Sequence, residues 1–224
     1  MSPVNCVSEV LESRTLLSSA SVSQGILHIV GDLTTANSIS VHRTSDNEIT
    51  VSMNGRDQLF GGCDLIYKVV IDGGNKADRL VINEKDLPLG VPVVMNGRGD
   101  DDTLIGGAED DTLNGGAGDD RIDGNGGNDR LTGGEGEDAL HGGDGNDVII
   151  AGNGNDTLTG GAGNDSLWGN AGHDDVSGDD GNDVMYGGRN QDAMFGGNGN
   201  DTFHGGDPRD QMDGGAGKNR FLKR

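Results

Sequence analysis

The feature that most constrains this chain is a nonapeptide that repeats without insertion or deletion from residue 106 to residue 222. Thirteen units fill that span, and three central ones read GGDGNDVII, AGNGNDTLT and GGAGNDSLW. The shared pattern is G-G-x-G-x-D-x-U-x, in which U is an apolar residue. A unit this short cannot bury a core alone, so each unit must stack on its neighbours. The repeat therefore predicts a solenoid.

The composition excludes several other kinds of protein. Of the 224 residues, 31% are hydrophobic and 3% aromatic, which is too little for an ordinary globular core. Collagen is excluded because it needs a Gly period of three and abundant Pro, whereas this chain has 4 Pro. The formal net charge of −22 would repel nucleic acid and attract multivalent cations. We also expect no membrane span, because the sequence has no long apolar run.

Within each unit, the last three residues predict a short strand whose middle side chain points inward, and the Gly-rich six residues before it predict a sharp turn. Two units complete one coil, so residues 18 apart stack. We therefore expect an all-β fold, a parallel β-roll or β-solenoid. The inward-pointing apolar stripe is predicted to be Leu104, Leu113, Ile122, Leu131, Leu140, Ile149, Leu158, Leu167, Val176, Met185, Met194, Phe203, Met212 and Phe221.

The Asp at the sixth position of each unit is the candidate metal ligand. One edge of the roll should carry Asp102, Asp120, Asp138, Asp156, Asp174, Asp192 and Asp210. The other edge should carry Asp111, Asp129, Asp147, Asp165, Asp183 and Asp201, and then Asn219. Carboxylates at strand spacing repel by about 3 kcal/mol per pair at an effective dielectric constant of about 20, so each column needs counter-charge.

Calcium suits these columns best. Ca²⁺ accepts six to eight oxygens in irregular geometry, so two Asp side chains from adjacent coils together with carbonyls of the Gly turns make a suitable cage. Mg²⁺ demands a tighter octahedron, and no Cys or His cluster has the spacing for Zn²⁺. Pairing each unit with the next but one predicts twelve sites, of which eleven have Asp from both coils.

The nonapeptide resembles the RTX, or haemolysin-type, calcium-binding repeat. The resemblance implies a secreted or cell-surface protein that binds several calcium ions. Some units depart from the pattern. Residues 96–105 are interpreted as an irregular fourteenth unit with one extra acid, and residues 73–81 as an earlier echo with Lys76 at the fourth position. Pro208 replaces a turn Gly, so we expect calcium sites to be weakest toward the C-terminus.

The N-terminal part is predicted to contain short strands at residues 26–30, 38–43, 48–53, 68–71, 79–82 and 91–95. We interpret residues 1–23 as a flexible targeting or processing segment, 24–95 as a β-rich lead-in or cap, 96–222 as the roll and 223–224 as a basic tail. A separate small β-sandwich is the alternative for residues 24–95. Residues 11–17 resemble the LEPR-XLL box of exported planctomycete proteins, with Ser13 in place of Pro. Cys6 and Cys63 are interpreted as free thiols, with a disulfide between them as the alternative.

One outward-facing stripe exceeds the repeat pattern. Ile150, Trp168, Tyr186 and His204 occupy the ninth position of alternate units, so they should stack on one face. The plain explanation is strand propensity. The alternative is a docking face for a glycan, a protein partner or a second copy of the chain.

Two classes of function fit the sequence. We expect a non-catalytic, calcium-binding extracellular structural or adhesive protein whose repeat block folds on binding Ca²⁺, since the thin apolar stripe cannot offset the entropy of ordering a Gly-rich chain. The alternative is the accessory calcium-binding module of a secreted enzyme or haemolysin-like toxin whose catalytic part is absent. We find no nucleophile, base and orienting group in any one motif, so the sequence predicts no enzyme.

Overall fold

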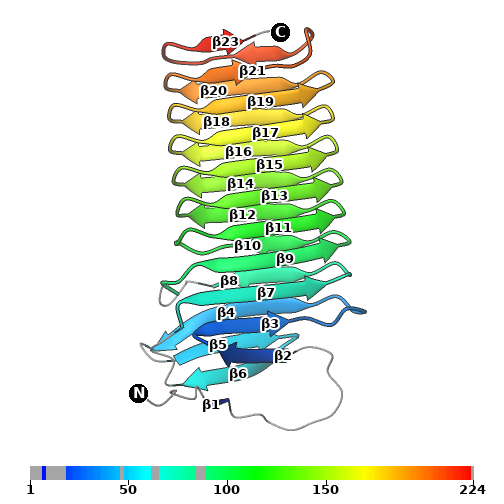
Figure 1. Cartoon of the computed structure of the whole chain (residues 1–224), viewed down its shortest axis with the longest axis vertical. Helices are drawn as coiled ribbons and strands as arrows, with labels where there is room; N and C mark the ends of the chain where they lie inside the picture. The colour runs from blue at the N-terminus through cyan, green and yellow to red at the C-terminus, as the bar shows by residue number, and fades with distance from the viewer. Residues whose placement is uncertain (1–6, 9–18, 46–47, 62–65, 84–88, 223–224) are drawn as a thin grey trace.

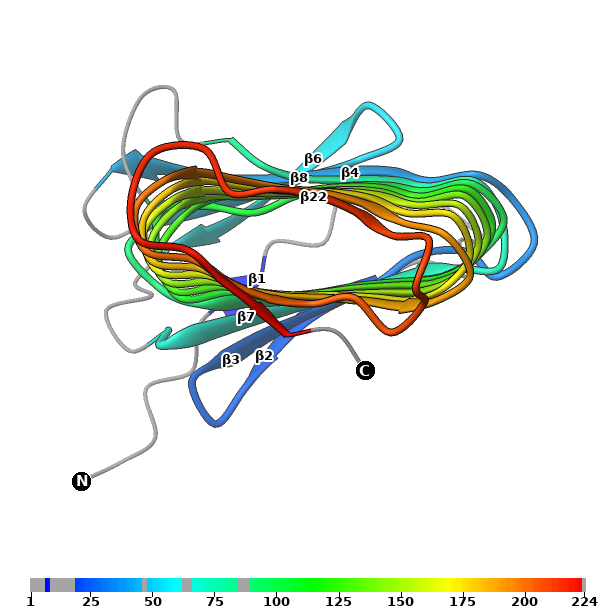
Figure 2. The ribbon, with the colours of Figure 1, turned by 90° about the horizontal axis from the view of Figure 1, so that it is seen from above.

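The computed structural model of the chain describes residues 7–8, 19–45, 48–61, 66–83 and 89–222. Throughout these residues the regular structure is β-strand, with no helix. The strands stack as coils along one long axis, with β1 (Val7–Ser8) at one end and β23 (Arg220–Leu222) at the other (Figure 1). Seen along that axis, the coils superimpose as a flattened oval whose two long sides are the two sheets (Figure 2). The expected all-β parallel β-roll is confirmed.

The described strands form two sheets, and from residue 68 onward successive strands alternate between them. The twelve-stranded sheet contains, in spatial order, β1 (Val7–Ser8), β6 (Arg56–Gly61), β5 (Glu48–Met53), β4 (Ser38–Ser45), β8 (Arg79–Ile82), β10 (Thr103–Ile105), β12 (Arg121–Gly126), β14 (Ala139–Asp144), β16 (Thr157–Ala162), β18 (Asp175–Asp180), β20 (Ala193–Asn198) and β22 (Gln211–Asp213). The eleven-stranded sheet contains β2 (Ser19–Ser23), β3 (Ile26–Val30), β7 (Lys68–Gly74), β9 (Val93–Gly99), β11 (Thr112–Ala117), β13 (Arg130–Glu135), β15 (Val148–Asn153), β17 (Ser166–Ala171), β19 (Val184–Arg189), β21 (Thr202–His204) and β23 (Arg220–Leu222).

Neighbouring strands of the repeat block pair in parallel with a register of 18 residues, as Leu113 with Leu131 shows. Two nonapeptides therefore complete one coil. The same register includes Thr103, which pairs with Arg121, so residues 97–105 form a regular unit and the prediction of an irregular one was wrong. GRGDDDTLI is itself nine residues long, and Arg98 and Asp100 adopt φ values of 86° and 66° where most other units use Gly. The register changes one coil earlier, where Val69 pairs with Val93.

The core is one continuous column of inward side chains. Every predicted stripe residue from Leu104 to Phe203 is at most 2% exposed, so burial of this stripe is confirmed. The two last members differ, because Met212 is only partly buried and Phe221 is 46% exposed. No further coil of the described chain covers them, although the Phe221 ring stacks on Phe203 at 4.8 Å between centroids.

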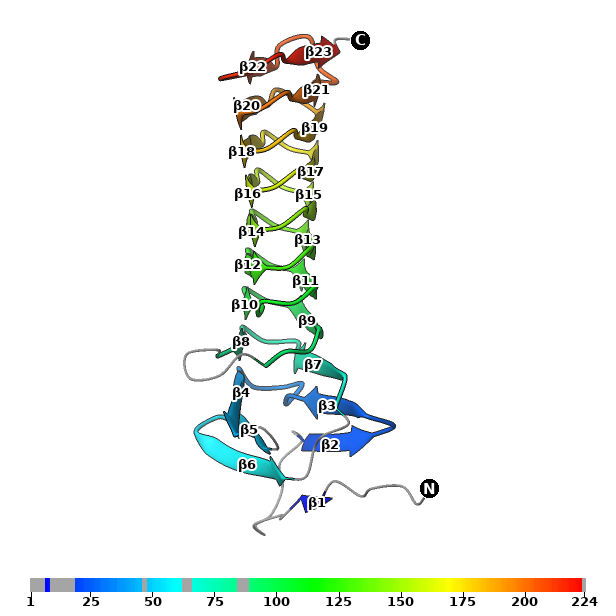
Figure 3. The ribbon, with the colours of Figure 1, turned by 90° about the vertical axis from the view of Figure 1, so that its left-hand side faces the viewer.

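At the N-terminal end the coils continue with less regular spacing. β3 and β7 extend one sheet in parallel, β4 and β8 extend the other, and antiparallel hairpins lie beyond them (Figure 3). All six predicted strands are present, although the last begins at Val93 rather than at residue 91. The sequence reading missed β1, β2 and β6, whose mostly small or polar residues give little hydrophobic alternation. Cys6, Cys63 and residues 11–17 lie outside the described residues.

Candidate metal sites

Each turn of the repeat block except the last, which has Asn219, carries one sixth-position Asp, and the turns line two edges. On the first edge, which includes Asp102, the turns lead from the eleven-stranded sheet to the other sheet. On the second edge, which includes Asp111, they lead back. Where Asn125 and Asn170 replace the second Gly of the unit, they adopt φ values of 71° and 73°. Asn is among the non-Gly residues that best tolerate this conformation, so these substitutions keep the turn intact.

One oxygen of each sixth-position carboxyl clamps two coils together. Oδ1 of Asp120 accepts the backbone N–H of Asp102 at 2.8 Å, and Oδ1 of Asp138 accepts that of Asp120 at 2.8 Å. All thirteen predicted Asp residues make this contact to the preceding coil, with distances of 2.7–3.1 Å. The structure thus brings the predicted residues together in two columns.

The other oxygen of most of these carboxyls has no partner. Oδ2 has no hydrogen-bond donor in eleven of the thirteen, and it is buried, because these residues are only 1–2% exposed. The eleven are Asp102, Asp120, Asp129, Asp138, Asp147, Asp156, Asp165, Asp174, Asp183, Asp192 and Asp201. A buried acceptor without a donor is costly, and a buried unpaired charge is more so. Each column therefore demands a positive charge.

Burial also changes the acidity of ten of these carboxyls. It raises the pKa of Asp102, Asp120, Asp129, Asp165 and Asp192 to about 7, and that of Asp138, Asp156 and Asp183 to about 6. Burial raises the pKa of Asp147 and Asp174 as well. For most of these carboxyls the next Asp in the column adds to the increase. The physical cause is that an ionised carboxylate loses its hydration and faces like charge.

The first Gly of each unit provides the space beside the unpartnered oxygen. A Cβ on Gly124 would contact Oδ2 of Asp129 and would lie 2.6 Å from the carbonyl oxygen of Gly142 in the next coil. Two acceptor oxygens therefore converge with no donor between them, which suits a hard cation. The Gly turns therefore fit a Ca²⁺ ion held by Asp Oδ2 and backbone carbonyls. One unit differs, because Ala151, which is fully buried, holds this position in the unit of Asp156.

The ends of the two columns differ from their middles. Oδ2 of Asp111 accepts the N–H of Gly107 at 2.7 Å, and Oδ2 of Asp210 accepts that of Asp207 at 2.9 Å in the turn that contains Pro208. Asn219 donates its Nδ2 to the carbonyl of Gly214 at 2.6 Å. These three positions have protein partners for the atom that elsewhere lacks one.

The sequence reading omitted one carboxyl that the structure adds to the first column. Asp78 is 3% exposed, its Oδ2 has no donor, and its backbone N–H binds Oδ1 of Asp102 at 2.7 Å. The signal that could have identified it was the echo of the repeat at residues 73–81, which keeps Asp at the sixth position.

The predicted aromatic stripe is present and is stacked on itself. The rings of Trp168 and Tyr186 are 5.4 Å apart and parallel within 1°, and those of Tyr186 and His204 are 4.3 Å apart at 11°. Because each ring covers the face of its neighbour, the rings present their edges outward. Such cross-strand stacking stabilises a sheet, whereas a flat sugar needs an open ring face.

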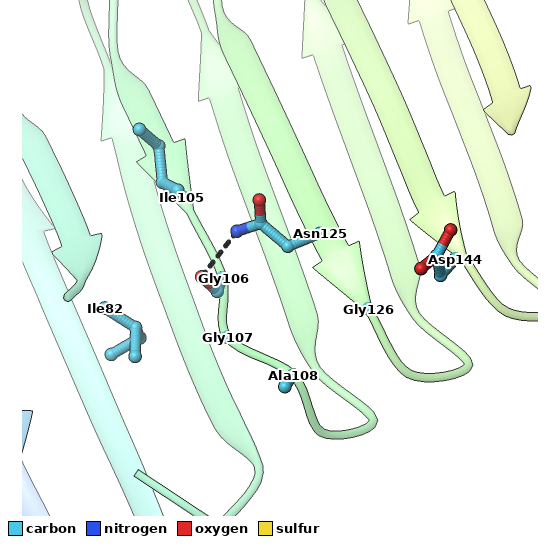
Figure 4. Close-up of a pocket in the computed structure, with 8 residues that line it drawn as sticks. All are labelled: Ile82, Ile105, Gly106, Gly107, Ala108, Asn125, Gly126 and Asp144. Atoms are coloured by element: carbon cyan, nitrogen blue, oxygen red, sulfur yellow. Dashed lines mark hydrogen bonds between the residues drawn. The ribbon is translucent and has the colours of Figure 1, made fainter. Parts of the chain in front are cut away.

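Among the described residues, no group of three or more His, Cys, Asp or Glu is placed to hold a metal ion, so a cation here must also use backbone carbonyls. A hollow beside the end of β8 is lined mainly by Gly, Ala and Ile, and Asp144 is the one acid in its lining (Figure 4). In this hollow Nδ2 of Asn125 donates a hydrogen bond to the carbonyl oxygen of Gly106. None of the described segments forms a helix long and apolar enough to cross a membrane.

Comparison with known proteins identifies the repeat. The family model for the RTX calcium-binding nonapeptide repeat matches six overlapping segments, at residues 96–131, 123–158, 132–167, 150–185, 159–194 and 186–221. No curated protein matches the chain. The matched segments cover more than half of the 224 residues and coincide with the turns that carry the two Asp columns. The chain therefore belongs to the RTX calcium-binding nonapeptide repeat family, whose members bind Ca²⁺ at multiple sites.

Proposed function

We propose that this chain is an extracellular structural or adhesive protein whose roll is held together by calcium. The observation that carries the proposal is the pair of columns in which eleven buried Asp residues each keep an unpartnered Oδ2. We assign the thirteen Asp residues from Asp102 to Asp210 as ligands, assisted by turn carbonyls. Bound Ca²⁺ supplies the charge that these oxygens lack.

We further propose that at neutral pH the repeat block folds only when Ca²⁺ is present. The inward stripe provides one apolar side chain per nine residues, and the turns contain Gly residues that lose much entropy on ordering. Ionised Asp columns oppose folding further, because their Oδ2 atoms are buried without donors. Binding to the folded state alone adds about 2.7 kcal/mol per site when free Ca²⁺ is a hundredfold above Kd.

Circular dichroism tests this coupling. In EGTA at neutral pH the protein should lose most of its β signal, and millimolar Ca²⁺ should restore it. Mg²⁺ at the same concentration is the control and should restore little, since it demands a tighter octahedron. A β signal that stays unchanged in EGTA would refute the coupling.

β3 pairs in parallel with β7, and β7 pairs in parallel with β9. This continuity supports a lead-in role for residues 24–95, which would cap the roll. A secreted or cell-surface location is supported by the family and by the high calcium concentration that weak extracellular sites require. The proposal is non-catalytic. The alternative, an accessory module of a secreted enzyme or toxin, predicts that a catalytic domain accompanies this roll in a longer protein.

A partner on the face of Trp168 and Tyr186 would have to bind ring edges and the flanking Val148 and Val184, because the ring faces stack on each other. This geometry favours a protein or a second copy of the chain over a stacked glycan. Replacing both aromatic residues with Ser should leave calcium binding intact. If the oligomeric state and polysaccharide binding also stay unchanged, the stripe serves only to stabilise the sheet.

A further inference from the structure

The first-edge column continues beyond the segment that matches the repeat family. Residues 73–78 form a turn of the same length as residues 97–102, and Gly74 pairs with Arg98 in the sheet. In Figure 3, β8 lies between β4 and β10, so the turn before β8 stacks on the turn before β10. The register of the coils is therefore kept across this junction, although 24 residues separate the paired positions.

We call the sixth position of each turn, which the Asp columns occupy, the ladder position. Asp78 holds this position in its turn and has the features of the other carboxyls in the column. Its Oδ1 accepts the N–H of Asn37 at 2.6 Å, and its Oδ2 is buried with no donor. A Cβ on Gly73 would contact that Oδ2, as it would at the first Gly of the repeat units. Lys76 does not neutralise Asp78, because its ammonium group lies 3.4 Å from Asp100 and is half-exposed.

The preceding coil closes the column with an amide. Asn37 occupies the ladder position there and is 4% exposed. Its Nδ2 lies within hydrogen-bond distance of the carbonyl oxygens of Asp32, Thr35 and Gly73 and of Oδ1 of Asp78, and its Oδ1 accepts the N–H of Asp32. Asn37 therefore satisfies the groups around it, and the unpartnered oxygens begin with Asp78.

We propose that residues 73–78 and 97–102 together hold one further Ca²⁺ ion, through Oδ2 of Asp78, Asp102 and turn carbonyls. Residues 73–78 lie before the matched residues 96–221 and residues 97–102 lie within them, so this site joins the N-terminal coils to the repeat block. The inference rests on calcium binding by the repeats, since it extends the same kind of cage by one coil.

Native mass spectrometry of the full chain at a fixed Ca²⁺ concentration tests the site by counting bound ions. Asp78→Asn should bind one ion fewer than the wild type and keep its β signal, because Asn37 and Asn219 show that this fold accommodates an amide at the ladder position. Asp57→Asn is the matched control. Asp57 lies exposed in β6, outside the turns of both columns, where its Oδ1 accepts the hydroxyl of Ser52, and Asn keeps that acceptor, so the count should not change.

Asp120→Asn, in the middle of the column, separates the two levels of the argument. If the wild type binds no Ca²⁺, the proposed function fails as a whole. If Asp120→Asn loses an ion and Asp78→Asn does not, only the junction site is wrong. Hydrogen exchange of residues 73–82 gives a second readout in case Asp78→Asn does not fold. Added Ca²⁺ should slow exchange there in the wild type, and an unchanged rate would overturn the site.

Discussion

Two adjacent glycines in one turn give the sharpest test of how the coils are packed. Gly126 and Gly127 stand at the third and fourth positions of the same unit. Gly127 has a φ of 107°, and a Cβ there would lie 2.5 Å from the carbonyl carbon and 2.6 Å from the carbonyl oxygen of Glu109. Gly126 has no atom of another coil within 3.8 Å of its Cβ position. The same substitution should therefore have opposite effects one residue apart.

The magnitude follows from these contacts. Carbon and oxygen normally approach no closer than about 3.3 Å, so Gly127→Ala must separate two backbones by roughly 0.7 Å or twist the turn. Overpacking costs about 1–3 kcal/mol, and a strained φ costs a similar amount, which together give about 3 kcal/mol of destabilisation. Gly126→Ala restricts the unfolded chain without a clash and should stabilise by about 0.5 kcal/mol. Five other units, those with Ala108, Ala117, Ala162, Ala171 and Ala216, already use Ala at the third position.

Urea unfolding in saturating Ca²⁺, followed by circular dichroism, measures the difference between the two variants. Gly127→Ala should unfold at a clearly lower urea concentration than Gly126→Ala, by the equivalent of about 3.5 kcal/mol. It should also bind fewer calcium ions, because the strained turn carries Asp129. Equal midpoints for the two variants would show that the coils have slack at the turns, and the close-packing argument would be wrong.

Two further predictions concern the columns themselves. Without Ca²⁺, eight of the buried carboxyls have pKa values of about 6–7 against about 3.9 when unfolded, so the folded roll binds more protons. The stability that these protons contribute is greatest below about pH 4 and is lost as pH rises through 6–7. Metal-free protein should therefore show more β signal by circular dichroism at pH 4 than at pH 8, and the opposite order would contradict the assigned burial. Asn219→Asp replaces the amide that closes the second column by a carboxylate next to Asp201, so native mass spectrometry should count one additional Ca²⁺. An unchanged count would mean that the last coil is too loose to hold an ion.

The parts of the fold that follow from the period were predictable from sequence. An exact nine-residue repeat fixes both which residues stack and which side they face, so the apolar stripe and the two Asp columns could be assigned by counting. The sequence does not show that Oδ1 of each Asp accepts a backbone N–H while Oδ2 is left without a donor. This arrangement depends on where the backbone N–H of Asp102 lies relative to Asp120 in the next coil, and that position is set by the twist of the turns.

Other features depended on contacts that counting cannot provide. The echo of the repeat marks Asp78 as a sixth-position residue, but Asp78 lies 24 residues before Asp102 rather than 18, so counting does not place it in the column. The pairing of β8 with β10 does. The self-stacked rings of Trp168 and Tyr186 share a face as predicted, but their orientation follows from side-chain rotation rather than from sequence spacing. The hairpin of β5 and β6 lies outside the repeat and has no period to reveal it.

A single atom decides whether a coil of this roll depends on calcium. Oδ1 of Asn219 accepts the backbone N–H of Asp201 in the preceding coil, as the Asp residues do, and Oδ1 of Asn37 accepts the N–H of Asp32 in its own turn. In both residues Nδ2 donates to a nearby carbonyl oxygen. An Asp at the same position offers an acceptor where the amide offers a donor, so two oxygens face each other and a cation must separate them. The amides stand at the start of one column and at the end of the other. The number of calcium ions that the roll requires therefore follows the number of carboxylates in the two columns whose Oδ2 has no donor, and changing one amide to a carboxylate should change that number by one.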